Sequence, residues 1–246
     1  MIVQIYEIQT PFEAEKCLEL GVDHIGSVLL SKDSWRLPAL KDVIRLTKEA
    51  GAKSSLIPLF EEPGTIFSVI DYYEPRYIHL CGTVSRIANY RIRIEEIVRF
   101  QSELKEKFPD LEIIRSIPVP QDGKAAHFSP LELAQALEPV SDLFLADTWV
   151  GSEPVEGFIG ITGKTSNWEL VRKLVYKSKI PVILAGGLSP ENVRAAIEKV
   201  VPAGVDSCTQ TNLVDKMGHP IRFRKDFKRV ERFVKEARMG KPQESE

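Results

Sequence analysis

The sequence predicts a (β/α)8 barrel, in which eight parallel strands form a closed ring inside a ring of helices. Eight short apolar runs alternate with eight longer amphipathic runs along 246 residues, a typical length for this fold. The apolar runs are continuous, as expected for parallel strands that are buried on both faces. A doubly wound open sheet has such strands too, but it usually has fewer of them, and no GxGxxG motif follows the first run. The barrel is therefore favoured over the open sheet.

The first half of the chain supplies four of the strand and helix pairs. Strands are predicted at residues 2–6, 24–30, 54–60 and 77–81, and helices at 11–20, 40–50, 66–72 and within 88–107. Gly21 and Gly51 directly follow the first two helices, where glycine readily adopts the left-handed conformation that ends a helix. Charge alternates along the fourth helix, so we expect that helix to be solvated.

The second half repeats the alternation. Strands are predicted at residues 111–119, 142–146, 181–185 and 204–208, and helices at 130–137, 168–177, 191–200 and 225–237. Ser189 is the expected N-cap of the seventh helix, with Pro190 at its first position. No Pro/Gly/Ser-rich linker divides the chain, so residues 1–238 are predicted to form one barrel domain and 239–246 a polar tail.

Composition narrows the functional class. The chain has 33 Lys and Arg against 35 Asp and Glu, a net charge of −2, whereas nucleic-acid binders are usually basic. Its three cysteines lie far apart, which fits a reducing cytoplasm better than a disulfide framework. No signal-peptide pattern and no apolar stretch of about 20 residues is present. We therefore expect a cytoplasmic protein that acts on a small molecule, with neither nucleic acid nor membrane as partner.

The clearest candidate site is the segment PVILAGGLSPENV at residues 181–193. Gly186 and Gly187 stand between a buried strand and a helix, so their backbone N–H groups can approach a ligand closely. Barrels often hold phosphate with the loops after strands seven and eight. The segment therefore indicates a phosphate site; the alternative is a simple tight turn.

A second glycine-rich segment, GITGKTSNW, occupies residues 160–168. Its GKT tripeptide invites comparison with a nucleotide P-loop, but Phe158 stands where that motif requires glycine. We interpret the segment as a flexible loop that brings Gly163 and Lys164 beside the phosphate. The alternative is an ordinary surface loop.

Two charged residues follow predicted strands at the end of the barrel where catalytic groups occur. Asp147 ends the sixth apolar run, where a carboxyl could act as general acid or base with a pKa raised by burial; alternatively it caps a turn with Thr148. Arg36 follows the second strand and offers a fork for a carboxylate or phosphate; alternatively it is a surface arginine beside Trp35. The four histidines have no metal-site spacing.

Taken together, these segments resemble the phosphoribosylanthranilate isomerase family, the barrel enzymes of tryptophan biosynthesis. The resemblance spans nearly the whole chain and is most specific in AGGLSPENV followed by GVD. The segments that carry it are TPFEAEKCLELGVDHIG (10–26), LADT (145–148), GKTSNW (163–168), PVILAGGLSPENV (181–193), GVDSCTQTN (204–212) and KDFKRVERFVKEA (225–237).

The resemblance implies an Amadori rearrangement of N-(5-phosphoribosyl)anthranilate without cofactor or metal. An acid protonates the ribose ring oxygen, the ring opens to a Schiff base, and a base removes the C2′ proton. The family's acid corresponds to Asp147, and its arginine for the anthranilate carboxylate to Arg36. The phosphate-binding backbone groups correspond to Gly163, Gly186, Gly187, Cys208 and Thr209.

The chain departs from the family at the base, because the family's cysteine corresponds to Tyr6, and a phenol supplies far less of its deprotonated form than a thiol. Three explanations stay open. Tyr6 or Glu7 acts as base, although strand alternation points Glu7 away from the side of Tyr6. Cys81 or Cys208 supplies the thiol from another strand. Alternatively, the chain is a paralogue that binds a phosphoribosyl-type metabolite without this chemistry, or a barrel enzyme for another sugar phosphate.

A second departure lies in the loop after strand eight. There Gln210 replaces a glycine that admits the phosphate in the family.

Overall fold

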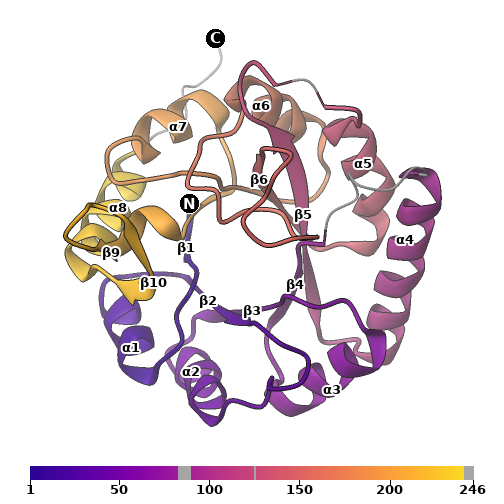
Figure 1. The fold of residues 1–246 in the computed structure, drawn as a ribbon, viewed down its shortest axis with the longest axis horizontal. Coiled ribbons are helices and arrows are strands. Elements are labelled where there is room, and N and C mark those ends of the chain that lie inside the picture. Colours follow the sequence, from indigo (N-terminus) through magenta and orange to yellow (C-terminus); the bar gives the residue numbers. More distant parts are fainter. Residues whose placement is uncertain (83–89, 125, 241–246) are drawn as a thin grey trace.

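A computed structural model describes residues 1–82, 90–124 and 126–240. Eight parallel strands form a closed barrel in the order β1 to β8, and helices surround it (Figure 1). The predicted (β/α)8 barrel is confirmed. Its strands are β1 Ile2–Ile5, β2 His24–Leu29, β3 Lys53–Pro58, β4 Tyr77–Leu80, β5 Glu112–Pro120, β6 Leu143–Trp149, β7 Val182–Leu184 and β8 Gly204–Ser207. Its helices are α1 Pro11–Glu19, α2 Pro38–Glu49, α3 Pro63–Tyr73, α4 Tyr90–Lys107, α5 Pro130–Leu137, α6 Trp168–Lys177, α7 Val193–Val200 and α8 Phe227–Met239.

The barrel closes where β1 pairs with β8. The register runs from Ile2 opposite Gly204 to Ile5 opposite Ser207. Gly204 permits this close approach, because a Cβ there would lie 2.7 Å from the Cβ of Ile2. The same register places Asp206 directly opposite Gln4, inside the ring.

Apolar faces of the helices cover the outside of the ring. Helix α8 buries Val230, Phe233, Val234 and Ala237, the i, i+3, i+4, i+7 pattern of an amphipathic helix. Each buried side chain of the size of Phe233 contributes about 1.5–3 kcal/mol. This packing fixes the last helix against the barrel. Within the described part of the chain, every helix is too short or too polar to span a lipid bilayer.

Three expectations for the helices were wrong or fall partly outside the described residues. Helix α7 begins at Val193 with Asn192 as N-cap, and Ser189 instead accepts a hydrogen bond from the Glu191 N–H in the turn before it. Helix α4 is not simply solvated, because one face buries Ile97, Gln101 and Leu104. Helix α8 continues through residue 239, and residues 241–246 of the predicted tail lie outside the described residues.

A hairpin that the sequence did not predict follows β8. Its strands, β9 Asn212–Val214 and β10 Pro220–Lys225, pair antiparallel. Asp215 shapes the turn by accepting hydrogen bonds from the N–H groups of Met217 and His219. The strands are short and largely exposed, so they lack the apolar run that marks a buried strand.

Candidate active site

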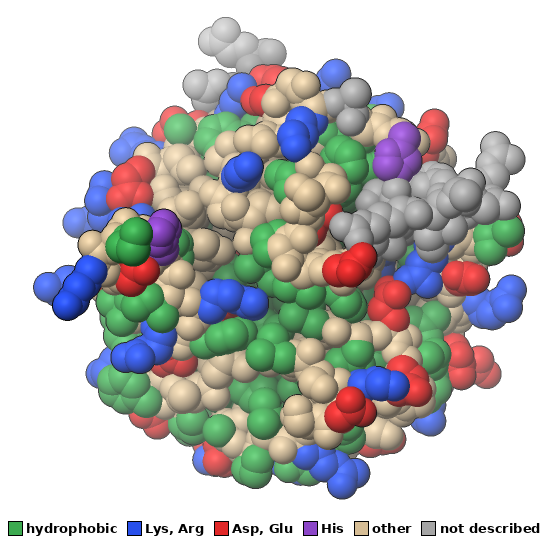
Figure 2. Space-filling model, viewed as in Figure 1, with side chains coloured by type: hydrophobic (Ala, Val, Ile, Leu, Met, Phe, Trp, Pro, Cys, Tyr) green, Lys and Arg blue, Asp and Glu red, His purple; other side chains and the backbone are tan. Residues whose placement is uncertain are grey.

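Two adjoining cavities open at the carboxyl ends of the strands, where hydrophobic side chains gather in the middle of the face and charged ones lie mainly around its rim (Figure 2). The mouth cavity is lined by Tyr6, Glu7, Val28, Ile57, Leu59, His79, Cys81, Ser116, Leu145, Asp147, Ile159, Ile161, Asp206 and Cys208. The loop cavity is lined by Asp147, Ile161, Thr162, Gly163, Gly186, Gly187, Leu188, Asp206, Ser207, Cys208, Thr209 and Gln210. Four residues line both cavities, and two of these are the carboxyls Asp147 and Asp206.

The loop cavity brings together the residues predicted to hold phosphate. Gly186 and Gly187 have φ of 83° and 58°, the left-handed region that favours glycine. A Cβ on Gly186 would lie 2.0 Å from Thr148 Oγ1, and one on Gly187 would lie 2.6 Å from the carbonyl carbon of Lys164. The loops after β6 and β7 therefore pack together in a way that only glycine permits.

Side-chain hydrogen bonds fix the same loops. Thr148 Oγ1 donates to the carbonyl oxygen of Lys164 at 2.6 Å. Gln210 donates from Nε2 to the carbonyl oxygen of Gly163 at 3.1 Å. The loop after β8 is thus tied to the loop after β6, and space remains between them.

Two residues that were predicted to contact the substrate, Lys164 and Arg36, do not line either cavity. The Lys164 side chain is exposed, and only its backbone packs against Gly187. Arg36 is exposed too, with its guanidinium 4.9 Å from the ring centroid of Trp35 and 5.9 Å from that of Tyr72. These are cation–π distances, so the aromatic neighbours hold Arg36 at the rim.

Asp147 lies near the end of β6 with its carboxyl in the walls of both cavities. Burial raises the pKa of Asp147 to about 6, opposed by the Thr148 N–H, which donates to Oδ1 at 2.7 Å. Gly160 packs over the carboxyl, because a Cβ there would lie 2.3 Å from Oδ2. The turn-capping bond and the cavity position that the sequence offered as alternatives occur together.

Tyr6 occupies the barrel interior beneath the mouth. Its hydroxyl lies 2.5 Å from Ser55 Oγ and 2.6 Å from His79 Nδ1, and His79 Nε2 lies 2.8 Å from Ser116 Oγ. Burial raises the pKa of Tyr6 well above 10, while burial and the Arg115 charge lower the pKa of His79 to about 3. A neutral phenol in a closed hydrogen-bond chain is a poor base.

A glycine on the neighbouring strand makes space for the large side chain of Tyr6. A Cβ on Gly26 of β2 would lie 2.2 Å from the Tyr6 ring. Gly26 therefore makes the room that the large side chain needs.

The position of the Glu7 side chain differs from the one that strand alternation predicts. Strand β1 ends at Ile5, and Glu7 has φ of 64°, so Glu7 and Tyr6 line the same cavity. Its Oε1 accepts a hydrogen bond from Arg222 Nε at 2.7 Å, and its Oε2 accepts from the Phe223 N–H at 3.2 Å. Burial alone would raise the pKa of Glu7, but the charges of Arg222 and Lys225 outweigh it and lower the pKa. Glu7 therefore anchors the hairpin as an ionised, paired carboxylate.

The two candidate thiols are present at the mouth but weakly acidic. Burial raises the pKa of Cys81 to about 12, although the Arg115 charge acts in the opposite direction. Burial likewise raises the pKa of Cys208, again opposed by a cation, Lys225. Few of these thiols are ionised at neutral pH, which makes both poor bases.

Asp206 is the functional candidate that sequence reasoning missed. It is 6% exposed on β8, and Gln4 Nε2 donates to its Oδ1 at 3.1 Å. Burial raises the pKa of Asp206 to about 8; the Asp147 charge raises it further, and the Gln4 bond and the Lys225 charge lower it. The available signal was an aspartate inside an otherwise apolar and small-residue strand, GVDS, next to the first strand. In addition, the described residues contain no group of three His, Cys, Asp or Glu side chains that could hold a metal ion.

Comparisons with known proteins show the family of the chain. The model of the N-(5'-phosphoribosyl)anthranilate isomerase family matches residues 97–209. The chain is similar to the N-(5'-phosphoribosyl)anthranilate isomerase of Moorella thermoacetica, with 33% identity over 90% of the chain and 85% of the relative. It is also similar to that of Methanocella arvoryzae, with 28% identity over 97% and 99%. The crystal structure of phosphoribosyl anthranilate isomerase from Thermotoga maritima superposes with a TM-score of 0.72 at 24% identity, covering 97% and 100% of the two chains.

Proposed function

The chain belongs to the N-(5'-phosphoribosyl)anthranilate isomerase family, and from this premise we propose that it isomerises N-(5-phosphoribosyl)anthranilate in tryptophan biosynthesis. The reaction is an Amadori rearrangement that converts the ribosylamine to an aminodeoxyribulose phosphate. The observation that carries the proposal is the pair of adjoining cavities, one walled by glycine-rich backbone and both containing Asp147 and Asp206. We place this reaction in the cytoplasm.

The loop cavity is the proposed phosphate site. Backbone groups of Gly163, Gly186, Gly187, Cys208 and Thr209 surround it, and backbone N–H groups bind phosphate oxygens without a counter-charge of their own. Asp206 has a pKa of about 8, so most of it is protonated at neutral pH and does not repel the phosphate. The anthranilate end then points toward the mouth cavity and its aliphatic wall.

Arg36 remains the proposed contact for the anthranilate carboxylate. Its guanidinium lies on Trp35 and Tyr72 at the rim, so it must leave these rings to reach a substrate. An exposed cation–π contact contributes only about 0.5–1 kcal/mol, and a fork-to-carboxylate contact can replace it.

We assign the two proton transfers to Asp147 and Asp206. Asp147 gives its proton to the ring oxygen, the C1′–O bond breaks, and the nitrogen lone pair forms the C1′=N bond of the Schiff base. Asp206 then removes the C2′ proton, and that electron pair forms the C1′=C2′ bond while the C=N electrons return to nitrogen. Asp206 returns its proton to C1′ and the C2′ hydroxyl loses its proton to Asp147, which gives the ketone. The reaction consumes no proton and requires no oxidant.

Asp206 suits the role of the lost cysteine better than the other candidates do. With a pKa of about 8 it is roughly one-tenth ionised at pH 7, compared with about 3% for a thiol of pKa 8.5. Tyr6 is ionised far less than either, because its pKa lies well above 10. Since β8 is the neighbour of β1, Asp206 approaches from the strand beside the one that carries the base in the family.

Growth of cells that lack this isomerase tests the proposed function. Cells that express the chain should grow without tryptophan, and Asp147→Asn should abolish growth while the protein remains folded. Soluble, folded protein without growth would contradict the proposal. If phosphate stabilised such an inactive protein, the chain would be a paralogue that binds a phosphorylated metabolite without isomerising it.

A further inference from the structure

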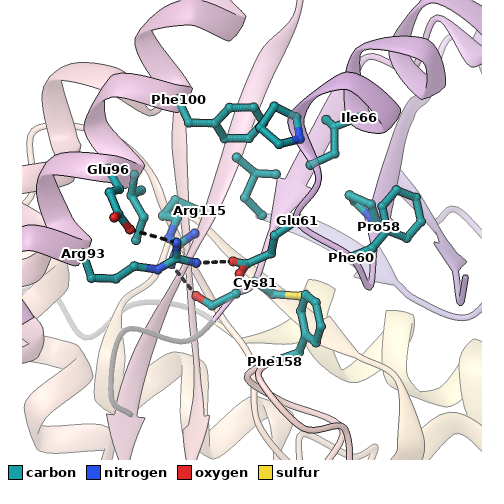
Figure 3. Close-up of a pocket in the computed structure, with 14 residues that line it drawn as sticks. Pro58, Phe60, Glu61, Ile66, Cys81, Arg93, Glu96, Phe100, Arg115 and Phe158 are labelled. Atoms are coloured by element: carbon teal, nitrogen blue, oxygen red, sulfur yellow. Dashed lines mark hydrogen bonds and ion pairs between the residues drawn. The ribbon is translucent and has the colours of Figure 1, made fainter. Parts of the chain in front are cut away.

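A third cavity lies outside the barrel, and we call it the outer cavity. It has about 640 Å³ of empty space, part of which is open to solvent, and sits between helices α3 and α4 and the outward side of β4 and β5 (Figure 3). Most of its wall is apolar, including Phe60, Ile66, Leu80, Ile97, Phe100 and Phe158. Such an apolar lining with a few polar groups is typical of sites that bind small organic molecules.

The polar end of the outer cavity contains two guanidinium groups. Figure 3 shows Arg93 and Arg115 gathered with Glu61 and Glu96, while Phe100, Ile66 and Phe60 lie on the opposite side. Arg93 pairs with Glu61 at 2.5 Å and with Glu96 at 3.4 Å. The carboxylates are half exposed, so they face the open side of the cavity.

Arg115 is buried without a comparable partner. It is 2% exposed, and its one hydrogen bond to the described residues goes from a terminal nitrogen to the carbonyl oxygen of Gly82 at 2.5 Å. Its Nε has no partner, and it forms no ion pair with any described residue. A buried, unpaired charge is costly and calls for a compensating anion. Burial lowers the pKa of Arg115 to about 10, opposed by Cys81 and Glu61, so it stays a cation at neutral pH.

We infer that the outer cavity binds a small carboxylate with an apolar body, its carboxylate on Arg115 and its body among Phe60, Phe100 and Phe158. Guanidinium is the side chain best shaped for a carboxylate, because its parallel N–H groups meet both oxygens. The apolar wall excludes water from that contact and selects an aromatic or branched aliphatic body over a sugar.

The outer cavity is separate from the proposed active site but adjoins it. Cys81 at the end of β4 lines both the outer and the mouth cavity. The Ile159 N–H donates to the Cys81 carbonyl oxygen at 2.9 Å, and Gly82 bridges to Phe158. The backbone between Phe158 and Ile161 therefore runs from the wall of the outer cavity to the walls of the two active-site cavities. Occupancy of the outer cavity does not require the catalytic carboxyls.

Calorimetric titration of the full chain with phenylacetate tests the inference, with 2-phenylethanol as the uncharged probe. We expect saturable binding of phenylacetate, at least tenfold weaker binding of the alcohol, and unchanged phenylacetate affinity in Asp147→Asn. Arg115→Met should weaken phenylacetate at least tenfold. The control Arg45→Met removes an exposed, paired arginine of α2 and should change the affinity less than twofold.

The fold of Arg115→Met provides an independent readout. Replacing a buried unpaired charge with an apolar side chain of similar length is often neutral or stabilising, so this variant should retain the wild-type melting temperature or exceed it. If it does not fold, Arg115→Lys keeps the charge without the fork and should bind phenylacetate measurably more weakly. The inference is wrong if phenylacetate shows no saturation up to about 10 mM. Equal affinity in the Arg115 variants would also overturn it, whether or not the chain is an isomerase.

Discussion

Varying the pH from 5 to 9 tests the two-carboxyl mechanism, because the reaction requires one proton on the Asp147–Asp206 pair. With pKa values of about 6 and about 8, the singly protonated pair makes up roughly 80% of the protein at pH 7 and about a tenth at pH 5 and pH 9. The value of kcat/KM should therefore fall about ninefold from pH 7 to pH 5 and from pH 7 to pH 9. The reactive form carries the proton on Asp147 and is about one-hundredth of the singly protonated pair, a share that does not change with pH, so the profile reports the pair rather than either residue.

The alkaline side of this profile is the diagnostic one, because the substrate phosphate also titrates near pH 6. Asp206→Asn removes the group with the higher pKa, so the alkaline decrease should begin near pH 6, where Asp147 loses its proton, and no longer near pH 8. Its kcat/KM at pH 7 should be about 10²- to 10⁴-fold lower, the usual contribution of general acid–base catalysis. Product formation by the purified enzyme, followed by liquid chromatography across the pH range, provides the measurement.

The matched control is Asp71→Asn, which changes an exposed aspartate on α3 and should leave the profile unaltered. A wild-type kcat/KM in Asp206→Asn would refute the assignment of the base. So would an alkaline limb near pH 8 that persists in this variant, because another group would then titrate there.

Three further predictions follow from the same contacts. Asp206 keeps its proton in the folded protein, whereas it ionises above pH 4 in the unfolded chain, so the free energy of unfolding of the wild type should fall between pH 4 and 8 by up to about 5 kcal/mol. In denaturant unfolding, the stability of Asp206→Asn relative to the wild type should therefore increase as the pH rises. A stability difference that stays constant with pH would contradict this. Tyr6→Cys should not raise activity and should destabilise the fold by about 3–5 kcal/mol, because it empties the space above Gly26 and leaves His79 Nδ1 without its partner. Tyr6→Phe should destabilise the fold less, and a more active Tyr6→Cys would show that the base belongs at position 6. Thr148→Val breaks the bond to the Lys164 carbonyl and should raise KM more than it lowers kcat, whereas unchanged steady-state kinetics would show that this bond does not shape the phosphate site.

The fold was predictable because its information is local. Each strand is a continuous apolar run, and the segment around Gly186 and Gly187 needs only short-range reasoning about backbone conformation. The position of Asp147 was predictable for the same reason, since its place at the end of an apolar run puts it at the mouth. The hairpin after β8 lacks such a run and escaped prediction.

The rest of the site depends on long-range packing. Glu7 leaves the strand geometry and binds Arg222, which is 215 residues away in the sequence. The raised pKa of Asp206 arises from burial beside Gln4, 202 residues away. The interpretation of Tyr6 as a possible base failed on the partners of its hydroxyl, which come from other strands. No pattern within one segment reveals such contacts.

A crystal structure with a reduced, stable analogue of the product tests the proposed site most directly. We predict that the phosphate lies among the backbone groups of Gly163, Gly187 and Thr209, with the sugar C2′ about 3–3.5 Å from the Asp206 carboxyl and its chain oxygens near Asp147. A phosphate bound outside the loop cavity, or a C2′ atom beyond the reach of Asp206, would contradict the proposal.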